Sequence, residues 1–218
     1  IVALMLSKGF KVITCSRSPQ KVAALNAEFA EYANAGKLVA LPVDMSVKGA
    51  VLEFAARIKA NEPHINVLVN NAGIFLPGNI MSEAEDTFEA LINTNVASAY
   101  HFTRALMSVI PVHKGAHIFN ICSTASITPY INGGSYCISK FALLGFSKVL
   151  REELKQHGIK VTALLPGPTL TDSWSGANLP ENRFMTPEDI AETLWAAYSL
   201  SPAASIEEIL MRPLPGDI

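Results

Sequence analysis

The sequence predicts a single α/β domain in which a doubly wound parallel sheet carries helices on both faces. Short β-branched and apolar runs alternate along the chain with helical patterns, which is typical of βαβ units. Several runs, such as residues 65–69, are apolar almost throughout, as strands buried on both faces are. With 218 residues the chain is long enough for one large core and too short for two comfortable domains.

The predicted strands follow directly from the positions of these apolar runs. The chain opens on residues 1–9, whose pattern indicates the last turns of a helix closed by Gly9. Strands are predicted at residues 11–15, 38–43, 65–69, 117–121, 160–164 and 206–211.

The first helices are predicted from their N-terminal residues. Ser18 is a good N-cap and Pro19 suits the first helical position, so a helix is expected over residues 18–36. Ser46 is expected to start the next helix, over residues 46–60.

A capping box is predicted further along the chain. Ser82 is followed three residues later by Glu85, which indicates the start of a long helix over residues 82–110. Further helices are predicted at residues 134–157, ended by Gly158, and from the capped sequence at 186–189.

The composition excludes several classes of protein. Hydrophobic residues make up 50% of the chain and charged residues 17%, which excludes a disordered protein. The net charge of −2 predicts neither a nucleic-acid partner nor an anionic membrane partner. The apolar stretches are too short for a membrane span, and residues 1–6 lack the basic leader of a signal peptide. We therefore expect a cytoplasmic protein.

The cysteines and histidines do not indicate a metal site. Cys15, Cys122 and Cys137 are far from any Cys-x-x-Cys spacing, and the five histidines form no His-x-His or His-Glu-x-x-His pair. We expect no bound metal and no disulfide framework.

Small and polar residues gather where three predicted strands end. Asn70-Asn71-Ala72-Gly73, the segment 122–126 and the segment 165–171 each follow one of them. Ligands of doubly wound sheets bind at the carboxyl ends of the strands, where small residues let a flat ligand approach the backbone. The alternative is that each segment is an ordinary loop.

Tyr136 and Lys140 lie one helical turn apart, so their side chains share one helix face. A nearby ammonium group favours phenolate, so we expect Lys140 to lower the tyrosine pKa and the pair to act as a general acid and base. By itself the pair is also compatible with an exposed tyrosine and lysine on a surface helix.

The joint arrangement of these residues resembles the short-chain dehydrogenase/reductase family. The resemblance runs from about Gly9 to Thr171 and continues more loosely to the end of the chain. The C-terminal segment is similar to that of the sepiapterin-reductase-like branch of the family. The resemblance implies a Rossmann-type fold and rests on Asn70-Asn71-Ala72-Gly73, Asn95, Ser123, Tyr136, Lys140 and Pro166-Gly167.

The resemblance also implies catalytic roles. Tyr136 would protonate a substrate carbonyl while hydride arrives from the nicotinamide, and Lys140 would hold the nicotinamide ribose. Ser123 would hydrogen-bond the carbonyl oxygen, and its spacing from Tyr136 fits the family better than that of Ser126. Asn95 would bind a water of the proton relay, unless it is a helix-interior asparagine facing solvent.

Cofactor contacts are implied in the same way. Asp44 and Met45 would touch the adenine, although Asp44 also suits the start of the helix at Ser46. The remaining contacts, implied by the resemblance, are Asn71, Ala72 and Gly73 near the adenine ribose, and Pro166, Gly167, Thr169 and Thr171 near the carboxamide and pyrophosphate.

The cofactor predicted for this site is NADP(H). Enzymes of this fold that use NAD place an acidic residue after the strand at 11–15, whereas an arginine there suits a 2′-phosphate. Ser16 and Arg17 occupy these positions, with Lys21 one turn further on. The alternative is that Arg17 is a solvated surface charge.

The sequence departs from the family in one respect. It lacks the Thr-Gly-x-x-x-Gly-x-Gly loop and the strand before it, which is the central strand of the family's sheet. The first two predicted strands are then left without a hydrogen-bonded neighbour on their inner side. We expect about 20 further residues upstream of Ile1.

The expected substrate is a small ketone, diketone or pterin side-chain carbonyl. The family's substrate lid corresponds to residues 172–185, where Trp174 is a candidate substrate contact, and Ile127 and Tyr130 are further candidates. No basic cluster marks the lid for a phosphopantetheine or nucleotide tail.

The function predicted is NADP(H)-dependent reduction of a small-molecule carbonyl to an alcohol. Alternatives are a 3-oxoacyl-[acyl-carrier-protein] reductase and a noncatalytic NADP-sensing protein. A sugar-nucleotide epimerase is disfavoured because too little chain follows Thr171. The resemblance implies a homodimer or homotetramer through the helices at 82–110 and 134–157, and the alternative is that their apolar residues are buried within one subunit.

Overall fold

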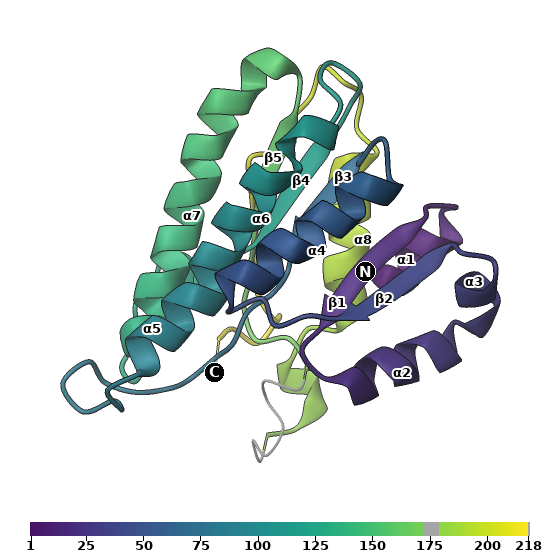
Figure 1. Cartoon of the computed structure of the whole chain (residues 1–218). Coiled ribbons are helices and arrows are strands. Elements are labelled where there is room, and N and C mark those ends of the chain that lie inside the picture. The colour runs from purple at the N-terminus through teal and green to yellow at the C-terminus, as the bar shows by residue number, and fades with distance from the viewer. Residues whose placement is uncertain (172–178, 218) are drawn as a thin grey trace.

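The computed structural model describes residues 1–171 and 179–217. Its strands are all parallel and form two sheets (Figure 1). One sheet has the order β1–β2 and the other the order β3–β4–β5–β6. The strands are β1 (Val12–Ser16), β2 (Leu38–Pro42), β3 (Val67–Asn70), β4 (His117–Ile121), β5 (Lys160–Pro166) and β6 (Glu208–Met211).

The inner edges of the two sheets are unpaired in the part of the chain that the structure describes. There β1 is hydrogen-bonded to β2 alone, and β3 to β4 alone. This pairing confirms that the first two strands lack a neighbour on their inner side. A cavity lies between β1 and β3.

Helices cover both faces of the larger sheet. Successive side chains of a strand point to opposite faces, so neighbouring residues contact different helices. Ile118 of β4 packs with α4 (Lys48–Asn61) and α6 (Ser98–Leu106), whereas the next residue, Phe119, packs with α8 (Pro187–Tyr198). Both side chains are fully buried. The doubly wound parallel arrangement predicted from the apolar strands is therefore confirmed.

Two helix starts were predicted correctly from capping residues. The Ser18 hydroxyl accepts a hydrogen bond from the Lys21 amide at 3.2 Å and begins α2 (Pro19–Glu28). Thr186 and Asp189 form the reciprocal capping box that begins α8. Both signals are local, so they do not depend on how the rest of the chain packs.

Two helix predictions in the first quarter of the chain were inaccurate. The helix expected over residues 18–36 breaks at Phe29, and a separate α3 (Ala30–Asn34) follows. Ser46 does not start α4, because its amide and hydroxyl both donate to the Asp44 carboxylate, at 2.9 and 2.7 Å. This turn delays the helix to Lys48.

The capping box predicted at Ser82 and Glu85 is wrong. Residues 79–86 form turns, and the helical region begins at Thr87 with α5 (Thr87–Ile92), followed by a π-helical turn (Asn93–Ala97) and then α6. The Glu83 carboxylate instead bonds Ser135 on α7 (Gly134–Leu154). A contact between distant residues therefore decides the structure of this segment.

Two helix ends predicted from glycines agree with the structure more closely. Residues 1–9 form α1 (Val2–Ser7) followed by Gly9, whose φ of 86° favours glycine. Helix α7 ends in a short 3-10 turn that reaches Gly158, also left-handed. No helix among the described residues is both long enough and apolar enough to cross a membrane.

Candidate active site

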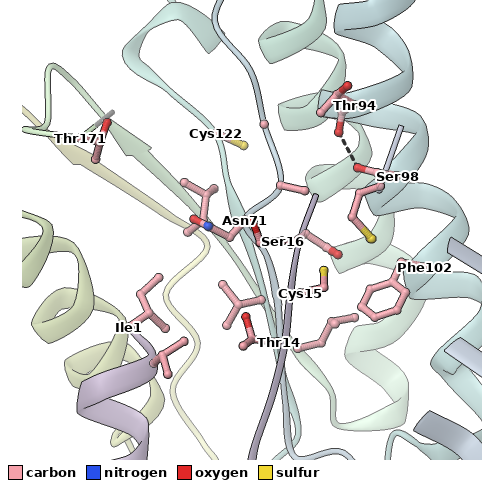
Figure 2. Close-up of a pocket in the computed structure, with 18 of the residues that line it drawn as sticks. Ile1, Thr14, Cys15, Ser16, Asn71, Thr94, Ser98, Phe102, Cys122 and Thr171 are labelled. Carbon is pink, nitrogen blue, oxygen red and sulfur yellow. Dashed lines mark hydrogen bonds between the residues drawn. The ribbon is translucent and has the colours of Figure 1, made fainter. Parts of the chain in front are cut away.

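A cavity of about 1520 Å³ lies between β1 and β3 and extends along the carboxyl ends of β3, β4 and β5. Figure 2 shows residues from distant parts of the chain around it, among them Ser16, Asn71, Cys122 and Thr171. Every residue predicted to bind the cofactor lines this cavity. They are Ser16, Arg17, Asp44, Met45, Asn71, Ala72, Gly73, Tyr136, Lys140, Pro166, Gly167, Thr169 and Thr171.

Tyr136 lies in the first turn of α7 and faces Ser123 at the end of β4. The two side chains are hydrogen-bonded, and the Phe75 ring packs edge-on against the tyrosine ring with centroids 4.8 Å apart. Ser123 and Tyr136 both line the cavity. The fold therefore places these two hydroxyl groups together, although they come from different elements.

The pKa of Tyr136 does not follow the sequence expectation. Burial raises the pKa of Tyr136 above its ordinary value, and the hydrogen bond with Ser123 opposes this effect. The Lys140 Nζ is 5.8 Å from the centre of the tyrosine ring. Desolvation of the phenolate thus outweighs the lowering by Ser123, the lowering expected from Lys140 is not observed, and the phenol stays protonated at neutral pH.

Lys140 is buried, with 7% of its surface exposed. Its Nζ donates a hydrogen bond to the Ile121 carbonyl oxygen at 3.0 Å. Burial lowers the pKa of Lys140 to about 8. The lysine is therefore fixed at the end of β4, and it is not the exposed surface residue of the alternative interpretation.

Asn95 is completely buried in the π-helical turn between α5 and α6. Its Oδ1 accepts from the Ile74 amide at 2.8 Å, and its Nδ2 donates to the Ile74 carbonyl at 3.1 Å and to Ser139 Oγ at 2.9 Å. The alternative of a solvent-facing asparagine is excluded. Asn95 ties the segment after β3 to α7, and its role with water remains a prediction.

Gly73 lies between Asn95 and Lys140. A Cβ at this position would be 3.4 Å from Asn95 Oδ1 and 3.7 Å from Lys140 Nζ. The short distances show that the Asn-Asn-Ala-Gly segment, the π-helical turn and α7 meet at one point.

Ser123 and Ser126, the two serines that compete for the same predicted role, differ in their contacts. Ser126 is 1% exposed, and its hydroxyl accepts from the Ser123 amide at 3.1 Å. Ser123 Oγ accepts from the Ala125 amide at 3.1 Å and lines the cavity. Ser126 is not among the lining residues, so it supports the backbone of Ser123 and does not compete with it.

The other end of the cavity is basic. Arg17 and Lys21 follow β1 and line the cavity beside Asp44, which follows β2. Hydrogen bonds from Ser46 lower the pKa of Asp44, and the Arg17 charge contributes to the same shift. Asp44 thus stabilises the turn before α4 while also lining the cavity, so its two interpretations are compatible.

One predicted site residue lies in a part of the chain that the structure does not describe, and some residues that line the cavity were not predicted from the sequence. Trp174 and the first half of the predicted lid, residues 172–178, lie outside the described residues. Phe75 and Thr128 line the cavity, and no local sequence signal marked them. No group of three or more His, Cys, Asp or Glu residues suited to a metal occurs in residues 1–171 and 179–217.

Comparison with known proteins agrees with this geometry. The sequence model of the family described as short chain dehydrogenase matches residues 1–182. The chain belongs to the short chain dehydrogenase family. This finding confirms the resemblance inferred from the motifs.

Two relatives with known names are similar to most of this chain. Sepiapterin reductase of Chlorobaculum tepidum is 31% identical over 179 residues, which cover 82% of this chain and 73% of the relative. An NADP-dependent 3-hydroxy acid dehydrogenase of Escherichia coli K12 is 28% identical over 226 residues, covering 98% of this chain and 89% of the relative.

Solved structures show the same fold. The crystal structure of serine dehydrogenase from Escherichia coli has a TM-score of 0.83 and 28% identity, covering 99% of this chain and 92% of that one. The closed form of serine dehydrogenase complexed with NADP+ has a TM-score of 0.86 and 26% identity, covering 100% of this chain and 90% of that one.

Proposed function

We propose that this short chain dehydrogenase uses NADPH to reduce a carbonyl group of a small molecule to an alcohol. The observation that carries the proposal is the hydrogen-bonded pair of Ser123 and Tyr136 at the cavity wall, with the buried Lys140 one helical turn further along α7. Structures of relatives in complex with NADP+ support the choice of cofactor.

The residues of the cavity fit NADP(H). Arg17 and Lys21 supply positive charge at the end of β1, where a 2′-phosphate requires it. Gly73 presents no side chain toward Lys140 and Asn95, so the backbone there stays accessible to a flat ligand.

The proposed reaction uses three side chains of this chain. NADPH, when bound in the cavity, would supply the hydride for the carbonyl carbon. Tyr136 donates its hydroxyl proton to the carbonyl oxygen, and Ser123 donates a hydrogen bond to the same oxygen. The phenolate that forms is stabilised by the Lys140 ammonium and recovers its proton from the buffer.

The raised pKa of Tyr136 suits this direction of reaction. A proton donor must hold its proton at neutral pH, and burial ensures that Tyr136 does so. The nearby Lys140 charge lowers the cost of the transient phenolate, since opposite charges in a poorly hydrated site attract strongly.

The decisive experiment is replacement of the acid. Tyr136→Phe removes one oxygen, and we expect it to abolish NADPH oxidation by a reactive diketone such as 2,3-butanedione while fluorescence titration still detects NADPH binding. Retained turnover would refute the assigned acid. Binding of NADPH without turnover of any carbonyl compound by the wild type would favour the noncatalytic NADP-sensing alternative. Preferential turnover of acyl-carrier-protein thioesters would favour the alternative reductase.

We also propose that the protein forms a homodimer or homotetramer through helices α5, α6 and α7. Leu144 and Leu150 are buried within the subunit, but Phe141 and Val149 of α7 are 44% and 57% exposed. Exposed Phe88 and Tyr100 lie on the neighbouring α5 and α6. The exposed apolar side chains thus extend over adjacent helices, as interfaces between subunits do.

The oligomer can be tested with charged substitutions. Val149→Glu is expected to shift the mass measured by light scattering toward that of a monomer, because it buries a charge in the proposed interface. Leu52→Glu, at a leucine of α4 that is 42% exposed, serves as the control and should leave the mass unchanged. A monomeric wild type would exclude the proposed association.

A further inference from the structure

The basic side chains that line the cavity are unevenly distributed. Arg17 and Lys21 belong to the β1 side, and Lys11 is paired with Glu62 at 2.5 Å near the start of β1. Among the described lining residues after His64, Lys140 is the one basic side chain. The β1 side thus holds Arg17 and Lys21 together with the acidic Asp44, whereas near Tyr136 the basic lining residue is Lys140.

The wall near Tyr136 consists of aromatic, aliphatic and hydroxyl side chains. Phe75 contacts the tyrosine ring, and Tyr130 lies close enough for its pKa to respond to Tyr136. The cavity lining also contains Ile74, Thr124, Thr128 and Leu170. Such a wall favours apolar and aromatic substrate groups over charged ones.

Lys140 does not supply a free cation for the substrate. Its Nζ is bound to the Ile121 carbonyl oxygen, and the side chain is 7% exposed. The cavity wall also includes Asp217, whose carboxylate is ion-paired with Arg212, and Arg212 is not among the described lining residues.

A carboxylate beside the reacting carbonyl would thus enter this region without a positive partner. Removing an ionised carboxylate from water without such a partner is expensive, and sites discriminate strongly when a polar group is left unpaired. An ester of the same acid has nearly the same shape and carries no charge.

We propose that the substrate is an uncharged ketone or diketone with an apolar or aromatic group beside the carbonyl, and that 2-oxo and 3-oxo acids are rejected. This inference rests on the proposed carbonyl reductase function. It separates the chain from relatives whose names specify a 3-hydroxy acid or serine.

Matched pairs of compounds test the proposal. NADPH oxidation is measured at pH 7 with methyl benzoylformate against benzoylformate, and with ethyl acetoacetate against acetoacetate. We expect kcat/KM for each ester to exceed that for its acid by at least about tenfold. Equal or better turnover of the acids would overturn the substrate class and leave the proposed function standing. Absence of NADPH oxidation with all four compounds and with 2,3-butanedione would overturn the proposed function and this inference together.

A variant that adds the missing charge gives a second test. Thr128 is exposed on the segment after Ser123 and lines the cavity. Thr128→Arg should reduce the preference for ester over acid by about tenfold, because it supplies a cation for the carboxylate. Thr128→Gln, which adds length without charge, should retain the ester preference of the wild type. A preference unaffected by Thr128→Arg would count against the electrostatic explanation.

The same discrimination should appear in equilibrium binding. With NADP+ present, methyl mandelate should raise the melting temperature of the protein more than mandelate at the same concentration, since only the neutral ligand enters without losing charge hydration. A larger shift with mandelate would contradict the proposal independently of turnover.

Discussion

The Lys140 Nζ donates a hydrogen bond to the Ile121 carbonyl oxygen at 3.0 Å, which links α7 to the carboxyl end of β4. The two residues are far apart in sequence, and the contact brings the lysine beside the segment that carries Ser123. Because the lysine is desolvated there, its positive charge destabilises the folded protein.

The first prediction concerns this destabilisation by the Lys140 charge. The pKa of Lys140 is lowered from 10.5 to about 8, so the unfolded chain binds more protons than the folded chain between these values. The destabilisation is therefore complete below pH 8 and disappears as the pH rises toward 10.5. We expect Lys140→Met to increase the free energy of unfolding at pH 7 by about 1–3 kcal/mol while abolishing activity. Urea unfolding of the cofactor-free protein at pH 7 and pH 10 measures this gain. A gain that does not shrink at pH 10 would point to packing instead of charge.

A second prediction concerns His117, which is 1% exposed. Its Nε2 bonds Thr162 Oγ1 at 2.7 Å, and burial lowers the pKa of His117 to about 3. Because the folded pKa lies below the unfolded value of about 6.5, stability is complete above pH 6.5 and falls as the pH decreases toward 3. We expect a loss of up to about 1.4 kcal/mol per pH unit in this range. His117→Gln, whose amide can keep the bond to Thr162, should unfold with a shallower pH dependence between pH 6.5 and 4.5. An identical slope in wild type and variant would exclude His117 as the cause.

A third prediction concerns Glu83, whose carboxylate accepts hydrogen bonds from the Ser135 amide, at 3.3 Å, and the Ser135 hydroxyl. Ser135 directly precedes Tyr136, so loss of this contact should loosen the first turn of α7. We expect Glu83→Ala to lower the free energy of unfolding by about 1–2 kcal/mol and to reduce kcat. Glu85→Ala, at an exposed glutamate two residues away, should change stability by less than about 0.5 kcal/mol. If both variants lost equal stability, the Glu83 contact would not be the reason.

The fourth prediction concerns Asn95, which satisfies both the amide and the carbonyl of Ile74. Replacing it with leucine keeps a similar volume but leaves two backbone groups without their partners in a buried site. We expect Asn95→Leu to lower the free energy of unfolding by about 2–4 kcal/mol, measured by urea denaturation. A cost below about 1 kcal/mol would show that water replaces the lost bonds.

The fifth prediction concerns cofactor preference. Arg17 follows β1 at the basic end of the cavity. Arg17→Ala should weaken NADPH binding by about tenfold and change NADH binding little, because only NADPH carries a 2′-phosphate. Fluorescence titration with the two nucleotides measures both affinities. Equal weakening for both would place Arg17 away from the 2′-phosphate.

Local sequence signals determined much of this fold. The apolar strands predicted a buried parallel sheet, and the caps at Ser18 and Thr186 located two helix starts, because these signals depend on neighbours within one turn. The motif residues after the strands also located the cavity, since the carboxyl ends of parallel strands share one edge.

Tertiary structure decided the features that depend on residues far apart in the sequence. Glu83, rather than Glu85, engages a helix because Ser135 lies beside it in space. The pKa of Tyr136 is raised instead of lowered because burial, which no spacing encodes, outweighs the hydrogen bond with Ser123. The spacing of Ser123, Tyr136 and Lys140 thus determined which groups form the site, and packing determined their protonation, because desolvation depends on everything that surrounds a group in the folded chain.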